Sequence, residues 1–251
     1  MLMLLQYDGG AYAGWQRQKA DRTVQADVET ALERLVGQRT PVTGAGRTDA
    51  GVHALGQAAA AALPEKWRAT DLVRALNALL PADVRVTDAC RMRSDFNPRR
   101  DATERTYSYR IGLDPGARSP FRRRWEWALN PPFDGARAAE AAALLVGEHG
   151  FRALSAAGQE KTHYRCRVSE ARWEMRPDGA GWEFWITAER FLHRMVRFLV
   201  GTMVEIAQHR RAALYLAALL DRDDNQAASR PAPAEGLFLV SVRYPVECYL
   251  V

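Results

Sequence analysis

The sequence predicts a mixed fold of helices and strands in a globular chain. Apolar residues recur with helical spacing in some segments and alternate with polar residues in others, and the two kinds of segment are interleaved. The 251 residues are 47% hydrophobic, which is enough for one large core or for two smaller ones. No stretch of the sequence is long and apolar enough to span a bilayer. We therefore expect one large domain or two closely associated ones.

Two helices are predicted in the first half. The first covers residues 24–36 and ends at Gly37, a residue type that commonly follows a helix. The second is expected to begin after Thr70, a favourable N-cap residue, and to end before Pro81. Each segment places its apolar side chains on one helical face: Val24, Val28, Leu32, Leu35 and Val36 in the first, and Leu72, Val73, Leu76, Leu79 and Leu80 in the second.

The N-terminus and the cysteines bear on the cellular compartment. Residues 1–5 are apolar, but they lack a basic region and reach the polar Gln6-Tyr7-Asp8 too early for a signal peptide. They are predicted to form a first strand of a cytoplasmic protein. The three cysteines are far apart and form no C-x-x-C pair, which predicts buried or inert thiols and neither disulfides nor a zinc site: Cys90, Cys166 and Cys248.

In the second half, the strand pattern is clearest at residues 103–111, where Tyr107, Tyr109 and Ile111 alternate onto one face. The segment 55–63 is rich in alanine, so its composition favours a helix. Residues 221–235 are polar and contain proline, as is typical of a connecting loop. Further strands are predicted at residues 124–129, 164–176, 182–189 and 237–244, and further helices at residues 134–146, 191–207 and 212–220.

The charge distribution suggests an anionic partner. The chain carries a formal net charge of +5, which by itself is also common in soluble enzymes without such a partner. Between residues 85 and 124, however, arginines far outnumber acidic residues. This segment is either a phosphate-binding stripe or a solvated surface in an arginine-rich protein.

A glycine-punctuated loop at residues 44–53, GAGRTDAGVH, contains one carboxylate, Asp49. Glycines allow a backbone to adopt unusual conformations or to approach a bound molecule closely, and active-site loops are often built this way. Aspartate, threonine and glycine are also ordinary turn residues. On composition alone, a surface turn is the simpler interpretation.

The sequence of this loop resembles the signature of the bacterial TruA family of tRNA pseudouridine synthases. Further blocks in the order of that family run from near the first residue to near the last, and a series of such blocks is far more specific than a single motif. The blocks are YDG at 7–9, GWQRQ at 14–18, TVQ at 23–25, ATERTYSY at 102–109, HRMVR at 193–197 and EGLFLV at 235–240.

The resemblance implies a specific fold and a specific reaction. The implied fold is α+β: two pseudo-symmetric halves, residues 1–100 and 101–251, share a mixed, mostly antiparallel sheet with helices on one side and a central basic cleft. In this fold, residues 55–63 form a strand. The implied activity is the isomerisation of uridine to pseudouridine at positions 38, 39 and 40 of the tRNA anticodon arm. The partners are tRNA and, in a homodimer, a second copy of the chain.

The resemblance also implies roles for particular residues. Asp49 is the expected nucleophile, and Arg197, which lies in the middle of the predicted helix at 191–207, is expected to pair with it. Tyr107 is expected to stack on the target base, Arg47 to contact the RNA backbone, and Leu237 to line the base pocket. From the pattern alone, Tyr107 and Leu237 are equally typical of a core strand, and Arg197 of a helix arginine that reaches solvent or pairs with another acid.

The expected reaction needs neither a cofactor nor a metal, because the base is only detached from the sugar and reattached through another carbon. The target nucleotide would have to leave its stack to reach the enzyme. Attack by Asp49 at C1′, attack at C6 of the base, and a glycal route all remain open. A noncatalytic RNA-binding protein is the alternative function, and a metal-dependent nuclease or phosphatase would need more carboxylates or histidines near Asp49.

Overall fold

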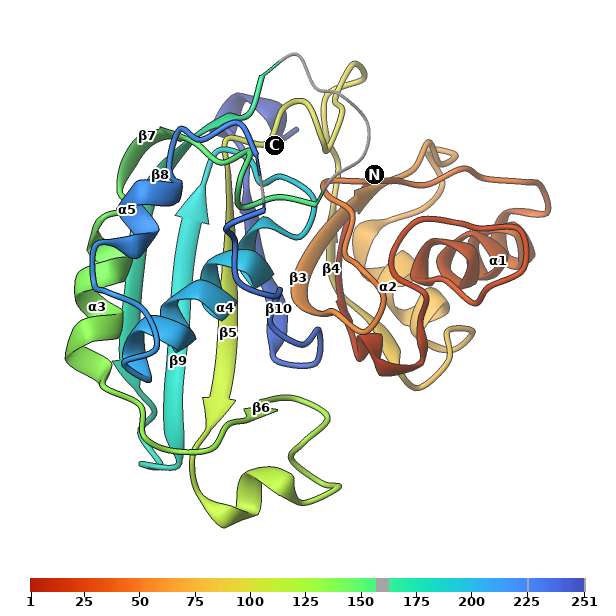
Figure 1. Cartoon of the computed structure of the whole chain (residues 1–251). Helices are drawn as coiled ribbons and strands as arrows, with labels where there is room; N and C mark the ends of the chain where they lie inside the picture. Colours follow the sequence, from red (N-terminus) through yellow and green to blue (C-terminus); the bar gives the residue numbers. More distant parts are fainter. Residues whose placement is uncertain (157–162, 225, 251) are drawn as a thin grey trace. The chain divides into compact units, whose positions relative to one another are not determined.

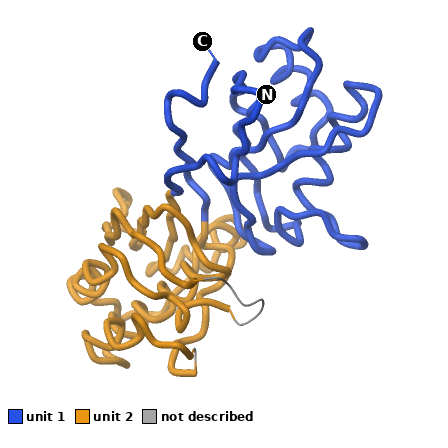
Figure 2. Tube along the Cα trace, turned by 90° about the horizontal axis from the view of Figure 1, so that it is seen from above, with its two compact units in different colours: residues 1–105, 238–251 blue, residues 106–237 orange. Residues whose placement is uncertain are grey.

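A computed structural model describes residues 1–156, 163–224 and 226–250. The chain forms two compact units: unit 1 comprises residues 1–105 and 238–251, and unit 2 comprises residues 106–237 (Figure 2). The α+β class is confirmed, because each unit combines a sheet with helices (Figure 1). The pseudo-symmetry of the halves 1–100 and 101–251 stays a prediction, as does the central cleft.

Unit 1 is a mixed sheet with two helices. Its strands lie in the order β4-β1-β3-β10, and β2 pairs with β3. All of these pairs are antiparallel except that of β3 with β10, which is parallel. Helix α2 packs against β4 and also contacts α1. The elements are β1 (Leu2–Tyr7), α1 (Val24–Val36), β2 (Thr43–Gly44), β3 (His53–Ala60), α2 (Ala69–Asn77), β4 (Val84–Cys90) and β10 (Leu237–Arg243), which joins unit 1 at Phe238.

Unit 2 also consists of a sheet with helices packed against it. Its strands lie in the order β5-β9-β8-β7, with β8 antiparallel to both of its neighbours and β6 parallel to β5. Helix α3 packs against β8 and against α4 (Figure 1). The elements are β5 (Glu104–Gly112), which enters unit 2 at Thr106, β6 (Trp127–Ala128), α3 (Gly135–Ala143), β7 (Gly147–Gly150), β8 (Arg165–Met175), β9 (Gly181–Ala188), α4 (Met195–Ala207) and α5 (Tyr215–Leu219).

The alanine-rich segment forms a strand, β3, as the family resemblance implies and against its helix propensity. It lies between β1 and β10, and Ala58 and Ala59 are fully buried. At Gly56 a side chain would meet the carbonyl oxygen of Val240 at 2.3 Å, so no larger residue fits there without a backbone shift. Small side chains therefore suit this central strand, and its tertiary environment outweighs the propensity of alanine.

Helix α1 matches the predicted bounds and ends at Gly37, which has a φ of 80°. Helix α2 differs from the prediction at both ends. Its N-cap is Arg68, so Thr70 lies inside the first turn, and it ends at Asn77, before Leu79 and Leu80. Asn77 is the last residue of α2, and its side chain bonds to β4. Its amide N–H donates to the Val86 carbonyl at 2.8 Å, and its amide oxygen accepts from the Val86 N–H at 2.9 Å. Two tertiary hydrogen bonds thus set this end.

Several elements of unit 2 are shorter than predicted. The strand expected at 124–129 reduces to β6, the helix expected at 212–220 to α5, and the helix expected at 134–146 to α3, which begins after the N-cap residue Asp134. Strand β7 was not predicted, because it is short and contains two glycines.

Cys166 and Cys248 are buried free thiols, and Cys90 is a half-buried one.

None of the helices in the described residues combines the length and the apolar character needed to cross a membrane.

Candidate active site

Asp49 lies in the irregular loop that joins β2 to β3 in unit 1. The side chain of Asp49 is half-buried, Arg47 is exposed, and Thr48 between them is buried. The Val52 N–H donates to the Asp49 carbonyl at 3.2 Å, which closes the turn just before β3 begins. The loop therefore leaves Asp49 partly exposed while its neighbour Thr48 is fixed in the interior.

The segment that follows β1 braces the Asp49 loop from one side. The Trp15 N–H donates to the Thr48 carbonyl at 3.1 Å, and the Gly51 N–H donates to the Tyr12 carbonyl at 3.3 Å. Gly14 has a φ of 103°, and a side chain there would meet the Thr48 carbonyl oxygen at 2.6 Å. Only glycine fits this approach, so the first residue of the sequence block GWQRQ at 14–18 has a structural reason.

Buried side chains support the same loop from beneath. The Tyr7 hydroxyl lies 2.9 Å from the Thr48 hydroxyl, and the Gln57 amide donates to the Gly46 carbonyl at 3.0 Å. Tyr7 is 4% exposed and Gln57 is fully buried. Sequence reasoning did not assign a role to any of these side chains. The only signal was that Tyr7 belongs to the YDG block and Thr48 stands directly before the carboxylate.

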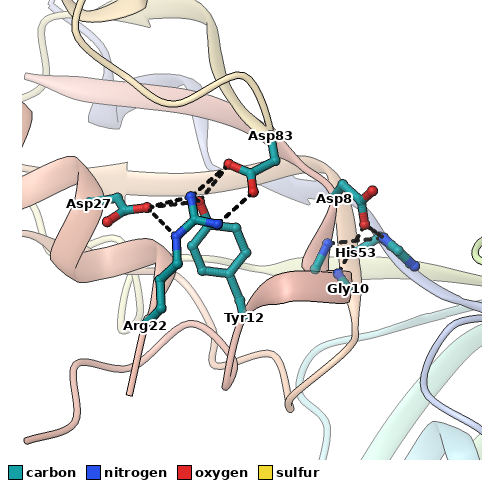
Figure 3. Close-up of polar contacts among 8 residues, drawn as sticks. Asp8, Gly10, Tyr12, Arg22, Asp27, His53 and Asp83 are labelled. Atoms are coloured by element: carbon teal, nitrogen blue, oxygen red, sulfur yellow. Dashed lines mark hydrogen bonds and ion pairs between the residues drawn. The ribbon is translucent and has the colours of Figure 1, made fainter. Parts of the chain in front are cut away.

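His53 and Asp8 lie where β3 begins (Figure 3). The Gly9 N–H lies 3.0 Å from Nδ1 of His53. An oxygen of Asp8 lies 3.2 Å from the same Nδ1. The His53 ring stacks on Phe238 of β10 at a centroid distance of 4.9 Å. His53 is thus a buried structural histidine.

An arginine clamp anchors the bracing segment to the rest of unit 1 (Figure 3). The Arg22 guanidinium donates to both carboxylate oxygens of Asp83, at 2.8 and 2.9 Å, and to Asp27 at 3.0 and 3.1 Å. The Tyr12 hydroxyl lies 2.8 Å from each of these carboxylates. The bidentate geometry is the stronger form of an arginine–carboxylate pair. The clamp joins the segment before α1 to the residues that lead into β4.

The clamp predicts an acid-sensitive contribution to stability. Burial alone raises the pKa of Asp83, but hydrogen bonds from Arg22 and Tyr12 outweigh it and hold the pKa below its usual value. A carboxyl whose pKa is lower in the folded state stabilises the fold above the unfolded pKa, and this stability is lost as the pH falls. We expect the difference in thermal unfolding midpoint between wild type and Asp83→Asn to narrow from pH 7 to pH 3.

Thermal unfolding across this pH range checks the prediction. Asp88→Asn is the matched control, because Asp88 is an exposed aspartate of β4 in the same unit. A difference between wild type and Asp83→Asn that stays constant down to pH 3 would show that the clamp does not depend on ionised Asp83.

The other predicted site residues lie in unit 2. Tyr107 is on β5, 9% exposed, and its ring meets Phe191 edge-on at 4.9 Å. Leu237, the first residue of β10, is 6% exposed. Tyr109, expected to be an ordinary core tyrosine, is fully buried, and its hydroxyl donates to the Pro233 carbonyl at 2.9 Å.

Arg197 does not lie in the middle of its helix, as the sequence had suggested. Helix α4 begins at Met195, four residues later than predicted, because Arg194 has a φ of 60° and cannot continue a right-handed helix. Arg197 therefore stands in the first turn, where it is half-buried. Its Nε donates to the Ala232 carbonyl at 2.7 Å, so part of its hydrogen-bonding capacity holds the loop before β10. The pairing of Arg197 with Asp49 stays a prediction.

The arginines between residues 85 and 124 are less available to phosphate than their number suggests. Arg93 and Arg100 pair with Asp101, and Arg110 pairs with Glu183. Others donate to backbone carbonyls: Arg91 to Glu65 and Trp67, and Arg105 to Ala45, Arg99 and Ala102. Much of the stripe is therefore structural. In the described part of the chain, no group of three or more His, Cys, Asp or Glu side chains has a geometry that could hold a metal ion.

Comparison with known proteins identifies the family. The family model described as tRNA pseudouridine synthase matches residues 3–99 and 141–245, which include Arg47, Asp49, Arg197 and Leu237 but not Tyr107. A protein of Myxococcus xanthus named tRNA pseudouridine synthase A is 39% identical over 96% of this chain and 91% of its own length. Relatives of the same name in Moorella thermoacetica and Frankia casuarinae are 40% and 41% identical over 96% of this chain, covering 97% and 88% of their own lengths. The chain belongs to the tRNA pseudouridine synthase family.

Proposed function

We propose that this protein converts uridine to pseudouridine in tRNA, at positions 38, 39 and 40 of the anticodon arm, with Asp49 as the nucleophile. The observation that carries the proposal is the similarity to tRNA pseudouridine synthases over nearly the whole chain, in which Asp49 lies within the matched segment. The position of Asp49 agrees with the role. Its side chain is half-buried in a loop whose neighbouring backbone is held on two sides.

The reaction is an isomerisation. The N1–C1′ bond of uridine breaks, a C5–C1′ bond forms, the C5 hydrogen leaves as a proton, and N1 gains a proton. No electron donor or acceptor is consumed. Asp49 takes part either by attack at C1′, by attack at C6 of the base, or in the formation of a glycal from the sugar. In each route the carboxylate must reach an extruded nucleotide, which is why its partial exposure matters.

The remaining site residues are assigned to substrate binding. Tyr107 is proposed to stack on the target base, an interaction that contributes roughly 1–3 kcal/mol per base in other nucleic-acid complexes. Exposed Arg47 is proposed to contact the RNA backbone, and Leu237 to line the base pocket. Arg197 is proposed as a further substrate contact. Two copies of the chain are proposed to form a homodimer, which light scattering of the purified protein would test.

Release of tritium from tRNA labelled at uracil C5 tests the proposed function. Purified protein, without added metal, is incubated with an unmodified tRNA that carries uridines at positions 38–40, and with a control tRNA that has cytidines there. We expect release from the first tRNA only, and pseudouridine at the substituted positions when the product is mapped. Tight binding without release from several eligible tRNAs would favour the noncatalytic RNA-binding alternative. Equal release from both tRNAs would refute the assigned positions.

A further inference from the structure

The hydroxyl groups of Tyr7 and Thr48 connect the end of β1 to the Asp49 loop. They lie 2.9 Å apart, and both side chains are buried, with 4% and 6% exposure. Burial raises the pKa of Tyr7 to about 12, so its hydroxyl keeps its proton at neutral pH and forms an ordinary hydrogen bond with Thr48. Tyr7 thus holds the residue directly before the carboxylate.

Gln57 holds the loop at a second point. Its amide donates to the Gly46 carbonyl at 3.0 Å and approaches the Tyr7 hydroxyl at 3.5 Å. Its amide oxygen is buried and has no hydrogen-bond partner among the described residues. A buried, unpartnered carbonyl oxygen destabilises a fold.

These contacts fix the loop on both sides of Arg47. Gly46 is held by Gln57, and Thr48 is held by Tyr7 through its side chain and by the Trp15 N–H through its carbonyl. With three of its backbone and side-chain groups held, the peptide that leads into Asp49 has little freedom. A nucleophile must lie close to its target in a narrow range of directions, and such pre-organisation lowers the barrier.

We propose that Tyr7 and Gln57 are positioning residues for Asp49, which act through Thr48 and Gly46 to hold the nucleophile in its reactive place. This inference rests on the proposed function, because it concerns the rate of that reaction. Neither side chain needs to touch the RNA. Their loss should therefore slow the chemical step and leave tRNA affinity nearly unchanged.

Single-turnover tritium release and tRNA binding test the proposal. Tyr7→Phe removes only the hydroxyl, and we expect its rate to fall by about 10- to 100-fold because a small displacement of a reacting group has effects of this size. The dissociation constant for tRNA should change by less than about twofold, since a residue that acts only on the reactive geometry leaves ground-state binding intact. Thr48→Val should behave in the same way, and Thr48→Ser, which keeps the hydroxyl, should restore most of the rate.

Gln57→Met separates positioning from stability. Methionine matches the size of glutamine and removes the unpartnered oxygen, so we expect the thermal unfolding midpoint to be unchanged or higher while the rate falls. If Gln57 had a purely structural role, Gln57→Met would lower the unfolding midpoint and leave the rate unchanged. Gly46 is a half-buried residue, so we expect water to replace the lost amide at its carbonyl.

Tyr244→Phe is the matched control for Tyr7→Phe. Tyr244 is also a buried tyrosine of unit 1, 7% exposed, and its hydroxyl donates to the Pro98 carbonyl at 2.8 Å, outside the Asp49 loop. It should lose similar stability but retain the wild-type rate. Equal rates in Tyr7→Phe, Thr48→Val and wild type would overturn the proposal. If wild type itself releases no tritium, the proposed function fails instead. If Tyr7→Phe does not fold, the Thr48→Val and Thr48→Ser pair decides.

Discussion

Asp49→Asn is expected to abolish pseudouridine formation. Asparagine has nearly the same size and shape but cannot serve as a carboxylate nucleophile, so single-turnover tritium release should fall by at least about 10⁴-fold. Binding of tRNA should persist, because the proposed contacts to RNA come from other side chains. The rate and the dissociation constant are measured on the same preparation, with circular dichroism to confirm that the variant is folded.

Asp88→Asn is the matched control for this experiment. It removes the same charge from unit 1 at an exposed position of β4, away from residues 44–53. Its rate should equal that of wild type. An Asp49→Asn variant that keeps its rate within about tenfold of wild type would exclude Asp49 as the nucleophile, because loss of a nucleophile has a far larger effect.

Gly14→Ala is expected to damage both stability and rate. The φ of 103° at this position strains any other residue, and the new Cβ would lie 2.6 Å from the Thr48 carbonyl oxygen. Strain and overpacking together should lower the free energy of unfolding by about 2–4 kcal/mol. Because the displaced atom belongs to the residue before Asp49, the rate should also fall, by about 10²-fold.

Gly37→Ala distinguishes these two causes. Gly37 has a φ of 80°, but a Cβ there would meet no atom within 4 Å. It should therefore cost only the backbone strain, about 1–2 kcal/mol, with no loss of rate. Chemical denaturation and single-turnover release measure both quantities. If Gly14→Ala loses stability but keeps the wild-type rate, the brace formed by Gly14 and Trp15 does not position the nucleophile.

Local sequence patterns were sufficient to predict the ends of a helix where the residues that set those ends lie within the helix or next to it. Helix α1 could be predicted with both ends because its apolar face and Gly37 are encoded within the segment. The predicted ends of helices α2 and α4 were wrong, because distant residues or an unusual backbone conformation set these ends. Asn77 bonds Val86 in another element, and Arg194 adopts a φ of 60° that a propensity scale does not anticipate.

The candidate nucleophile could also be selected from the sequence, but only through its resemblance to a family. Composition alone favoured a surface turn for the loop that contains Asp49, since its residue types are common in turns. The resemblance added Tyr107, Arg47, Arg197 and Leu237. The structure then placed Arg197 in the first turn of α4, with its Nε on the Ala232 carbonyl.

The mixed class of the fold, the family and a candidate nucleophile could all be predicted from the sequence, because each is indicated by contiguous residues or by blocks whose order along the chain is visible. The contacts that hold the loop around Asp49, however, became visible only in the tertiary structure. Tyr7 and Thr48 are 41 residues apart, and Tyr7 and Gln57 are 50 apart. Their hydrogen bonds exist because β1 and β3 are neighbours in one sheet, and pairing between distant strands leaves no periodic signal in either segment.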